Sequence, residues 1–389
     1  MSRTMTEMEN FPEGALTGIR VIDLTRILAG PFCTMLLADM GAEVIKIESP
    51  SGGDAVRSQG IIRDGMSWYF AQFNRNKKSV TLDLYSDEDK NKLAELLKDA
   101  DILVENFRPG VLAKMGFGKD YLDTLNPGLI VASVNGYGST GPYTDRPSFD
   151  FIAQAMSGFM SVTGEADGAP MRAAPPMADL IAGLYCAFGA VTALNSRNRS
   201  GKGQYVETSL TNSLISLMAF LSADYFAGGE VPARSGNNHA IVAPYGLFKA
   251  KDGAIAVAPS NDTYVERFLG AVGLKHLLVD ERFRTNADRM RNRPALLKII
   301  DAATELHSVD YWIDIINKAG CPCGRVMDLQ EVFDDPQVRA MEMVLDVDHG
   351  DSGVVRMTGF PVKLSKTPAR VHRPAPKLGE HNEEILGET

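Results

Sequence analysis

The chain has 389 residues, of which 44% are hydrophobic and 23% are charged, and its formal net charge at pH 7 is −9. These values are ordinary for a globular protein, and the length predicts two domains or one large domain with an insertion. An acidic balance without a long basic run makes nucleic acid and anionic membranes poor candidates for the main partner. An anionic ligand would have to be met by local positive groups.

The N-terminal segment, MSRTMTEMENFPEG, is polar and acidic and lacks the apolar core of a secretory signal, so we expect a cytoplasmic protein. The next stretch, RVIDLT at residues 20–25, reads as a buried strand. PFCTMLLADM begins with Pro31 and reads as a helix that opens with proline in its first turn and ends at Gly41. A strand followed closely by a helix is the first unit of an alternating pattern.

The alternation continues to residue 135. Further strands are predicted at residues 42–48, 79–84, 101–106 and 129–135. Ser86, with Asp89 in the capping-box position, predicts a helix that runs to about Lys98. Strands that alternate with helices at this spacing imply a parallel α/β sheet of Rossmann type. The turn after the first strand, RILAGPF, has one glycine in place of GxGxxG, so no nicotinamide cofactor (NAD) is expected.

The second half begins with an apolar helix from Asp179 to about Leu194, followed by a turn and the strand YVETSL. The apolar stretch SLISLMAFLSADYF is too short and too interrupted to span a bilayer, so no membrane partner is expected. Glycine and proline at residues 227–236 indicate a linker, and Lys251-Asp252-Gly253 indicates a hairpin.

These shifts in composition predict two domains. A large Rossmann-like domain covers residues 1–225, and a smaller α+β domain covers residues 226–330. Residues 331–389 are expected to return to the large domain, because the tail from Pro361 is proline-rich and extended and would lie across another surface. The predicted fold class is α/β.

Neither a metal site nor a serine hydrolase is indicated. The six histidines are scattered, and the chain contains no GxSxG or HExxH motif. One residue separates Cys321 from Cys323, which is not a CxxC motif, and no second cysteine pair completes a zinc site. The other cysteines lie in apolar sequence, as small hydrophobic side chains do in a reducing compartment.

Positive and aromatic side chains gather in loops that we expect at the carboxyl edge of the sheet. They are Arg26 after the first strand, Arg75, Lys77 and Lys78 before the third, and Asn106, Phe107 and Arg108 after the fourth. Ligands of open α/β sheets bind at that edge, where arginine and lysine suit phosphates and an aromatic wall suits a nucleobase. Each cluster taken alone could equally be a group of solvated charges on a loop. Three clusters at one edge of the sheet favour a polyphosphate ligand.

The segment RAAPPMADLIAGLYCAFGA, residues 172–190, places one carboxylate between a Pro-Pro turn and a run of small and apolar residues. Asp179 is a good helix N-cap, a role worth about 1 kcal/mol. A carboxylate also forms covalent acyl intermediates when an activated acyl group reaches it and water is excluded. The small flanking residues leave room for an acyl chain, so the cap and the nucleophile both remain open, and both can be true.

Seven stretches together resemble the family III CoA-transferases, the group that includes formyl-CoA:oxalate and carnitine CoA-transferases. They are GIRVIDLTRILAGPFCTMLLADMGAEVIKIESPSGGDAVR, FNRNKKSVTLDL, ADILVENFRPGVLAKMGFG, LNPGLIVASVNGYGSTGPYTDRPSFDFIAQAMSG, the Asp179 segment, SGKGQYVETSL and LGEHNEEIL. They span almost the whole chain in the order of the family.

The resemblance implies that Asp179 is the catalytic aspartate and that coenzyme A, carried as an acyl-CoA, is a substrate. Contacts to coenzyme A are implied at Leu28, Ala29, Phe73, Asn74, Arg75, Asn76, Asn106, Phe107, Arg108, Lys114, Arg146, Phe149 and Asp150. The loop charges described above add Arg26 and Lys77 to the expected contacts. A family arginine after the second strand is replaced by Ser49, which departs from the pattern. The family fold is a two-domain chain that forms an interlocked homodimer.

The implied reaction moves CoA from an acyl-CoA to a free carboxylic acid through an aspartyl anhydride and an aspartyl-CoA thioester, without ATP or metal. Succinyl-CoA is a candidate donor. Small dicarboxylates are candidate acceptors because Arg234, Asn238 and His239 lie in one loop, and backbone N–H groups near residues 236–238 are candidates to stabilise the oxyanions.

Two other functions remain open. The family contains α-methylacyl-CoA racemases, which use a histidine in a RAGHD-like segment. This chain has RPSFD there, with Phe149 at the histidine position, and a racemase needs two acid/base groups. The second alternative is a non-catalytic CoA-binding protein, in which Asp179 would serve only as a helix cap.

Overall fold

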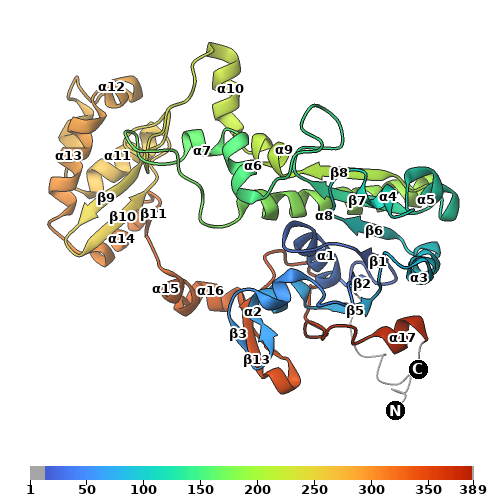
Figure 1. Cartoon of the computed structure of the whole chain (residues 1–389). Helices are drawn as coiled ribbons and strands as arrows, with labels where there is room; N and C mark the ends of the chain where they lie inside the picture. Colours follow the sequence, from blue (N-terminus) through green and yellow to red (C-terminus); the bar gives the residue numbers. More distant parts are fainter. Residues whose placement is uncertain (1–13, 388–389) are drawn as a thin grey trace. The chain divides into compact units, whose positions relative to one another are not determined.

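A computed structural model describes residues 14–387 of the chain (Figure 1). The chain forms two compact units. Among the described residues, the large unit contains residues 14–160, 172–229 and 336–387, and the small unit contains Ser161–Met171 and Glu230–Asp335. Residues 161–171, which the sequence analysis placed in the large domain, group with the small unit.

A six-stranded sheet forms the centre of the large unit, in the order β5-β2-β1-β6-β7-β8. Its strands are β1 (Arg20–Asp23), β2 (Glu43–Glu48), β5 (Lys77–Thr81), β6 (Ile102–Glu105), β7 (Ile130–Asn135) and β8 (Tyr205–Ser209). Every neighbouring pair is parallel, as the alternating sequence pattern predicts. The strand order reverses between β1 and β6, which creates the crevice where such sheets bind ligands.

Helices cover both faces of this sheet. The helices that pack into the two cores beside the sheet are α1 (Ala29–Asp39), α3 (Asp87–Lys98), α4 (Val111–Lys114), α5 (Lys119–Leu125), α6 (Asp150–Met156), α8 (Met177–Ser200) and α9 (Leu210–Ser216). The large unit also contains α2 (Trp68–Asn74) and α10 (Ala219–Gly228), and the chain passes from the large unit to the small unit within α7 (Phe159–Val162). Successive strand residues point to opposite faces. Val21 packs in the core with α1 and α8, and Ile22 packs in the core with α3 and α5.

Within residues 14–387, α8 is the one helix whose length and mean hydropathy of 1.7 would allow it to span a membrane. However, 44% of its apolar window is buried, and Ala182, Cys186 and Ala190 pack in the core against α1 and the sheet. A core helix of a globular protein has these properties. Gly183 allows α1 and α8 to approach closely, because a Cβ atom at this position would lie 2.4 Å from the carbonyl oxygen of Ala29.

The remaining elements of the large unit are short, and several of them pack against α2 rather than against the sheet. They are the short helix η2 (Ala55–Ser58), the hairpin β3 (Ile62–Arg63) and β4 (Met66–Ser67), and the C-terminal α16 (Pro336–Ala340), β12 (Val344–Asp348), η4 (Gly350–Ser352), β13 (Val354–Thr358) and α17 (Asn382–Leu386). The extended tail lies along β5, where His381 N donates to Ser79 O at 2.9 Å and Thr81 N donates to Asn382 Oδ1 at 2.9 Å. The tail thus covers the edge of the sheet formed by its own chain.

The small unit contains an antiparallel sheet of β9 (Gly246–Ala250), β10 (Gly253–Val257) and β11 (Cys323–Arg325), in the order β11-β10-β9. Its helices are α11 (Asp262–Ala271), η3 (Lys275–Leu278), α12 (Asn286–Arg291), α13 (Arg293–Thr304), α14 (Val309–Lys318) and α15 (Leu329–Asp334). The predicted hairpin at residues 251–253 joins β9 to β10. Phe248, Ile255 and Phe268 form part of a separate core, which gives this unit its α+β character.

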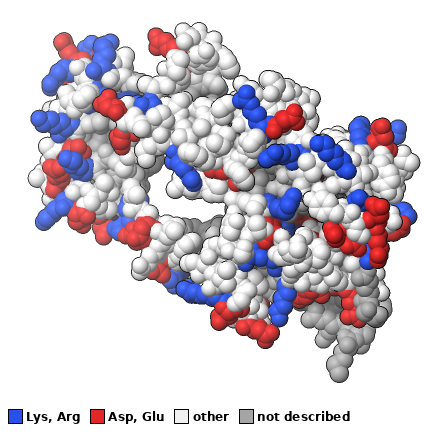
Figure 2. Space-filling view, viewed as in Figure 1, with Lys and Arg blue, Asp and Glu red and all other residues white. Residues whose placement is uncertain are grey.

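Acidic and basic side chains are interspersed over the face shown in Figure 2. On this face, neither sign of charge forms a continuous patch.

Candidate active site

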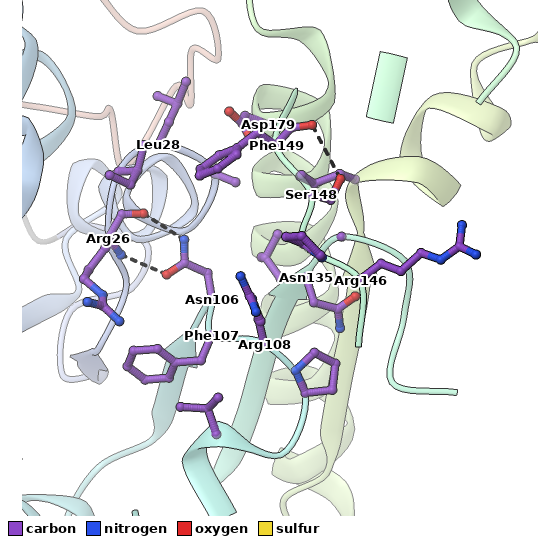
Figure 3. Close-up of a pocket in the computed structure, with 18 of the residues that line it drawn as sticks. Arg26, Leu28, Asn106, Phe107, Arg108, Asn135, Arg146, Ser148, Phe149 and Asp179 are labelled. Carbon is purple, nitrogen blue, oxygen red and sulfur yellow. Dashed lines mark hydrogen bonds between the residues drawn. The ribbon is translucent and has the colours of Figure 1, made fainter. Parts of the chain in front are cut away.

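A cavity of about 390 Å³ opens in the large unit where the strand order reverses (Figure 3). Its walls come from the segments that follow β1, β6 and β7 and from the start of α8. The lining includes the predicted residues Arg26, Leu28, Ala29, Asn106, Phe107, Arg108, Arg146, Phe149 and Asp179. The structure therefore brings the predicted nucleophile together with three of the predicted arginines in one cavity.

Asp179 is the third residue of α8 and does not cap this helix. The N-cap is Pro176, which makes no side-chain capping hydrogen bond. Asp150 Oδ1 instead accepts a hydrogen bond from Ala178 N at 2.8 Å, and Asp150 Oδ2 accepts one from Gln154 Nε2 at 2.7 Å. The prediction that Asp179 acts as the cap is wrong, because the carboxylate of Asp150 already satisfies the start of the helix.

The Asp179 carboxylate lies in an unusual electrostatic environment. Burial and, second, the negative charge of Asp150 raise the pKa of Asp179 to about 7. Among residues 14–387, no group donates a hydrogen bond to this carboxylate. Its oxygen lone pairs are therefore available for reaction, as a nucleophile requires.

This pKa predicts a pH dependence of any reaction in which Asp179 attacks. The attacking form is the carboxylate, so we expect kcat/KM to fall as the pH drops below about 7, by about tenfold per pH unit. Asp150→Asn removes the neighbouring charge but keeps an amide oxygen for the Ala178 N–H. We expect the acidic limb of its pH–rate profile to move to lower pH. If the acidic limb of this variant does not move, the limb does not report the ionisation of Asp179 next to the charge of Asp150.

The cavity also carries positive and aromatic groups. The guanidinium of Arg26 lies 5.0 Å from the centre of the Phe107 ring, and that of Arg146 lies 3.8 Å from the centre of the Tyr143 ring. Asn106 joins the first two walls of the cavity, since its side chain accepts from Arg26 N at 2.9 Å and donates to Arg26 O at 2.8 Å. With Arg108, these groups suit an anionic ligand that carries a flat ring or an apolar arm.

The sequence model of CoA-transferase family III matches residues 16–382. This chain belongs to CoA-transferase family III. The match covers nearly the whole of both units and confirms the resemblance that the sequence motifs indicated.

Several relatives of this family III CoA-transferase are similar over most of their length. A succinate–glutarate CoA-transferase of Agrobacterium fabrum is 38% identical, with 99% of this chain and 98% of the relative covered. An acetyl-CoA:oxalate CoA-transferase of Acetobacter aceti is 39% identical, with 95% of this chain and 94% of the relative covered. A succinyl-CoA:glutarate CoA-transferase of Mus musculus is 38% identical, with 96% and 86% covered.

Solved structures agree with the fold. A CAIB/BAIF family protein from Brucella suis superposes with a TM-score of 0.85 at 36% identity, covering 96% of this chain and 99% of that chain. The protein Rv3272 from Mycobacterium tuberculosis superposes with a TM-score of 0.87 at 29% identity, covering 97% and 100%. The predicted class, an α/β fold with a large parallel sheet, is confirmed.

One predicted cluster of the family III chain does not reach the cavity. Arg75 is 1% exposed and its Nη2 contacts Asp39 Oδ2 at 2.8 Å, and Lys77 is fully buried with its Nζ 3.1 Å from Asp23 Oδ2. Asn76 is also buried and donates to Asp39 Oδ1. The prediction that this segment shares an edge with the other clusters is wrong. It precedes β5 and lies at the amino edge of the sheet, where buried carboxylates neutralise its charges.

Four other predicted residues also lie outside the cavity lining. Phe73 packs edge-on against the rings of Phe32 and Tyr69. Asn74 is buried and donates to the carbonyl of Phe70 at 3.0 Å, and Lys114 is the exposed last residue of α4. Asp150 is 8% exposed and holds the start of α8. A coenzyme A contact by the side chains of Asn74 and Asp150 is therefore not supported by their surroundings.

The predicted acid-recognition residues belong to the small unit. Asn238 Nδ2 donates to Ser235 O at 3.2 Å, and the His239 ring lies 4.9 Å from the Tyr245 ring. The Arg234 guanidinium donates to three backbone carbonyls, of which that of Gly168 is 2.6 Å away. Arg234 therefore ties residues 161–171 to the linker, and recognition of an acid by this loop stays a prediction.

Tyr69 of α2 is a neighbour of Asp179 that the sequence reasoning missed, although it does not belong to the cavity lining. Burial and, second, the charge of Asp179 raise the pKa of Tyr69 to about 12, so the two side chains lie within electrostatic reach of each other. The phenol is protonated at neutral pH and is a hydrogen-bond donor. One aromatic residue within WYFAQF gives no sequence signal for this role.

Proposed function

We propose that this family III chain moves CoA from succinyl-CoA to a second small dicarboxylic acid. The observation that carries the proposal is the partly buried Asp179 carboxylate, free of hydrogen-bond donors from residues 14–387, in a cavity lined by Arg26, Arg108 and Arg146. The names of the similar relatives support the substrate class, since they include succinyl-CoA, glutarate, oxalate and mesaconate as substrates.

Four acyl exchanges complete the reaction. Asp179 attacks the thioester carbonyl of the donor, which gives an acyl-aspartyl anhydride and CoA thiolate. The thiolate attacks the aspartyl carbonyl, which gives an aspartyl-CoA thioester and releases the donor acid. The acceptor carboxylate then attacks this thioester and forms a second anhydride, from which the returning thiolate takes the acceptor acyl group and frees Asp179. One thioester replaces another, so the exchange needs no ATP.

The surroundings of Asp179 support these steps. Because the carboxylate is partly buried and water competes poorly for the anhydride, transfer is favoured over hydrolysis. Arg26, Arg108 and Arg146 would bind the phosphates of CoA, and Phe107 would line the path of its apolar or aromatic part. The proton of the Tyr69 phenol is available to a developing oxyanion near Asp179.

The racemase alternative fits the same cavity less well. Phe149 lines it at the position where the racemases carry a histidine, and a phenyl ring transfers no proton. A non-catalytic CoA-binding protein would need the arginines of the cavity, but it would have no need for a partly buried carboxylate whose pKa is raised.

An acceptor screen separates these functions. Purified protein is incubated with succinyl-CoA and each member of a panel of dicarboxylic and monocarboxylic acids, and new thioesters are identified by mass. We expect a new thioester with at least one dicarboxylic acid. If no acid of the panel accepts CoA although CoA binds, the transferase proposal fails. Deuterium incorporation at the α-carbon without an acceptor would favour a racemase.

We also infer a homodimer of the interlocked kind. Leu184, Phe188 and Val191 lie on one face of α8 at helical spacing and are exposed, Phe188 by 69%. An apolar stripe of this size on a core helix is typical of a surface that a partner covers. Size-exclusion chromatography with light scattering should give twice the mass of 42.2 kDa. A monomer at micromolar concentration would contradict this inference.

A further inference from the structure

The link between β1 and α1 is held by side chains from other parts of the large unit. Lys46 Nζ donates to Thr25 O at 2.7 Å, and the Asn106 side chain pairs with both backbone groups of Arg26. Asp54 accepts from Ile27 N, with its two carboxylate oxygens at 3.1 and 3.2 Å. Successive peptide groups of this short loop are thus fixed by side chains from strand β2, from the segment after β2 and from the segment after β6.

This loop has a strained backbone. Ile27 has a φ of 70°, in the left-handed region where a β-branched side chain meets its own backbone. Leu28, which follows it, has φ −138° and ψ −60°, outside the regular regions. Such conformations persist only where the surroundings over-determine them, and they gather at functional sites. The strained residues Ile27 and Leu28 both line the cavity that contains Asp179.

The group that holds Ile27 is a buried ion pair. Asp54 and Lys46 have side chains with no exposed surface, and Lys46 Nζ lies 3.0 Å from Asp54 Oδ2. Burial disfavours the charge of Lys46, but the charges of Asp23 and Asp54 outweigh burial, so the pKa of Lys46 lies above its usual value. Neither Asp54 nor Lys46 belongs to the lining of the cavity. Asp54 instead lines a smaller cavity of about 120 Å³, which shares Arg26 and Phe107 with the first. We therefore expect its effect on a ligand in the cavity that contains Asp179 to pass through the loop.

We propose that Asp54, paired with Lys46, is a positioning residue that holds residues 26–28 in the strained conformation in which the cavity accepts acyl-CoA. The proposal rests on the proposed function of that cavity. A loop that served stability alone would be better built with glycine at position 27, because glycine adopts positive φ without strain. The strain is tolerated if the backbone shape of this wall, which Asp54 enforces, matters for the ligand.

The first test is Asp54→Ala, which removes the acceptor of the Ile27 N–H, compared with Asp54→Asn, which keeps one acceptor oxygen. We expect kcat/KM for succinyl-CoA to fall about 100-fold in Asp54→Ala and clearly less in Asp54→Asn, since a small displacement of a positioning group has effects of this size. Asp39→Asn is the matched control. It breaks another buried ion pair of the large unit, with Arg75, that does not touch the loop.

The second test adds Ile27→Gly to each Asp54 variant. Glycine relieves the strain, so the double variants should recover about tenfold in kcat/KM over the Asp54 single variants. A residue that only stabilises the fold would show no such recovery. The proposal is overturned if Ile27→Gly gives no recovery, or if Asp54→Ala loses no more kcat/KM than Asp39→Asn at a similar loss of melting temperature.

Two further arms keep the test decisive. If Asp54→Ala does not fold, Asp54→Asn with and without Ile27→Gly supplies the same comparison. If the wild-type protein transfers no CoA, the proposed function fails, and the loop is then tested by calorimetric titration with CoA. If the affinity for CoA falls more in Asp54→Ala than in Asp54→Asn and recovers in the double variants, the positioning role is supported independently of the reaction. Equal affinities in all these variants would contradict it.

Discussion

Asp179→Asn is expected to abolish CoA transfer and to keep the fold and the binding of CoA. Asparagine has the shape of aspartate but cannot form an anhydride or a thioester, and loss of a nucleophile lowers kcat by at least about 10³-fold. No residue from 14 to 387 donates a hydrogen bond to Asp179, and Asp150 already caps α8. The substitution therefore breaks no described contact, and calorimetry should give the wild-type affinity for CoA.

The same variant should be more stable than the wild-type protein at pH 8. A carboxyl group whose pKa is raised to about 7 by folding binds more protons in the folded state than in the unfolded state between pH 3.8 and about 7. Protonated Asp179 therefore stabilises the folded state of the wild-type protein. This contribution to the free energy of unfolding is lost as the pH rises through that range. The asparagine side chain carries no charge, so the advantage of the variant should grow from pH 4 to pH 7 and then stay constant. Thermal melts across this range measure it, and equal melting temperatures at pH 8 would contradict the buried charge.

Gly183→Ala is expected to destabilise the large unit by about 3 kcal/mol or more. Its methyl group would lie 2.4 Å from the backbone oxygen of Ala29, and backbone cannot rotate away as a side chain can. Gly183 lies one turn after Asp179 in α8, and Ala29 lines the cavity. Separation of α1 from α8 should therefore lower transfer activity together with stability.

Gly270→Ala provides the matched control for this substitution. Gly270 is also inside a helix, α11, but an added Cβ there meets no atom of the described structure within 4 Å. Alanine at an open helical position should increase the free energy of unfolding by about 0.5–1 kcal/mol. Urea unfolding of both variants should thus give changes of opposite sign. A Gly183→Ala protein as stable as the wild type would show that the two helices are not in close contact.

Much of the fold could be predicted from the sequence, because its signals are local. Strands such as β2 and β7 are short apolar runs between turns, and their alternation with amphipathic helices predicts a parallel sheet. The predicted hairpin before β10 also agrees with the structure, since a Lys-Asp-Gly turn specifies its own geometry.

The surroundings of the charged residues could not be predicted, because their partners are distant in sequence. Arg75 pairs with Asp39, and Lys77 pairs with Asp23, so charges that looked available for phosphate are neutralised inside the protein. The cap of α8 is Asp150, from another helix, which leaves Asp179 free of that role. Asp54 gave no sequence signal of its own, because its contact with Ile27 depends on the tertiary fold.

We expect Asp179 to carry the acyl group and then CoA as covalent intermediates. The most direct measurement incubates the protein with succinyl-CoA alone and treats it with hydroxylamine, which converts anhydrides and thioesters to hydroxamates but leaves free carboxylates unchanged. Intact mass and peptide mapping should locate a hydroxamate on Asp179, absent from Asp179→Asn and lost after prior addition of acceptor acid. An unmodified Asp179 in a preparation that transfers CoA would contradict the account.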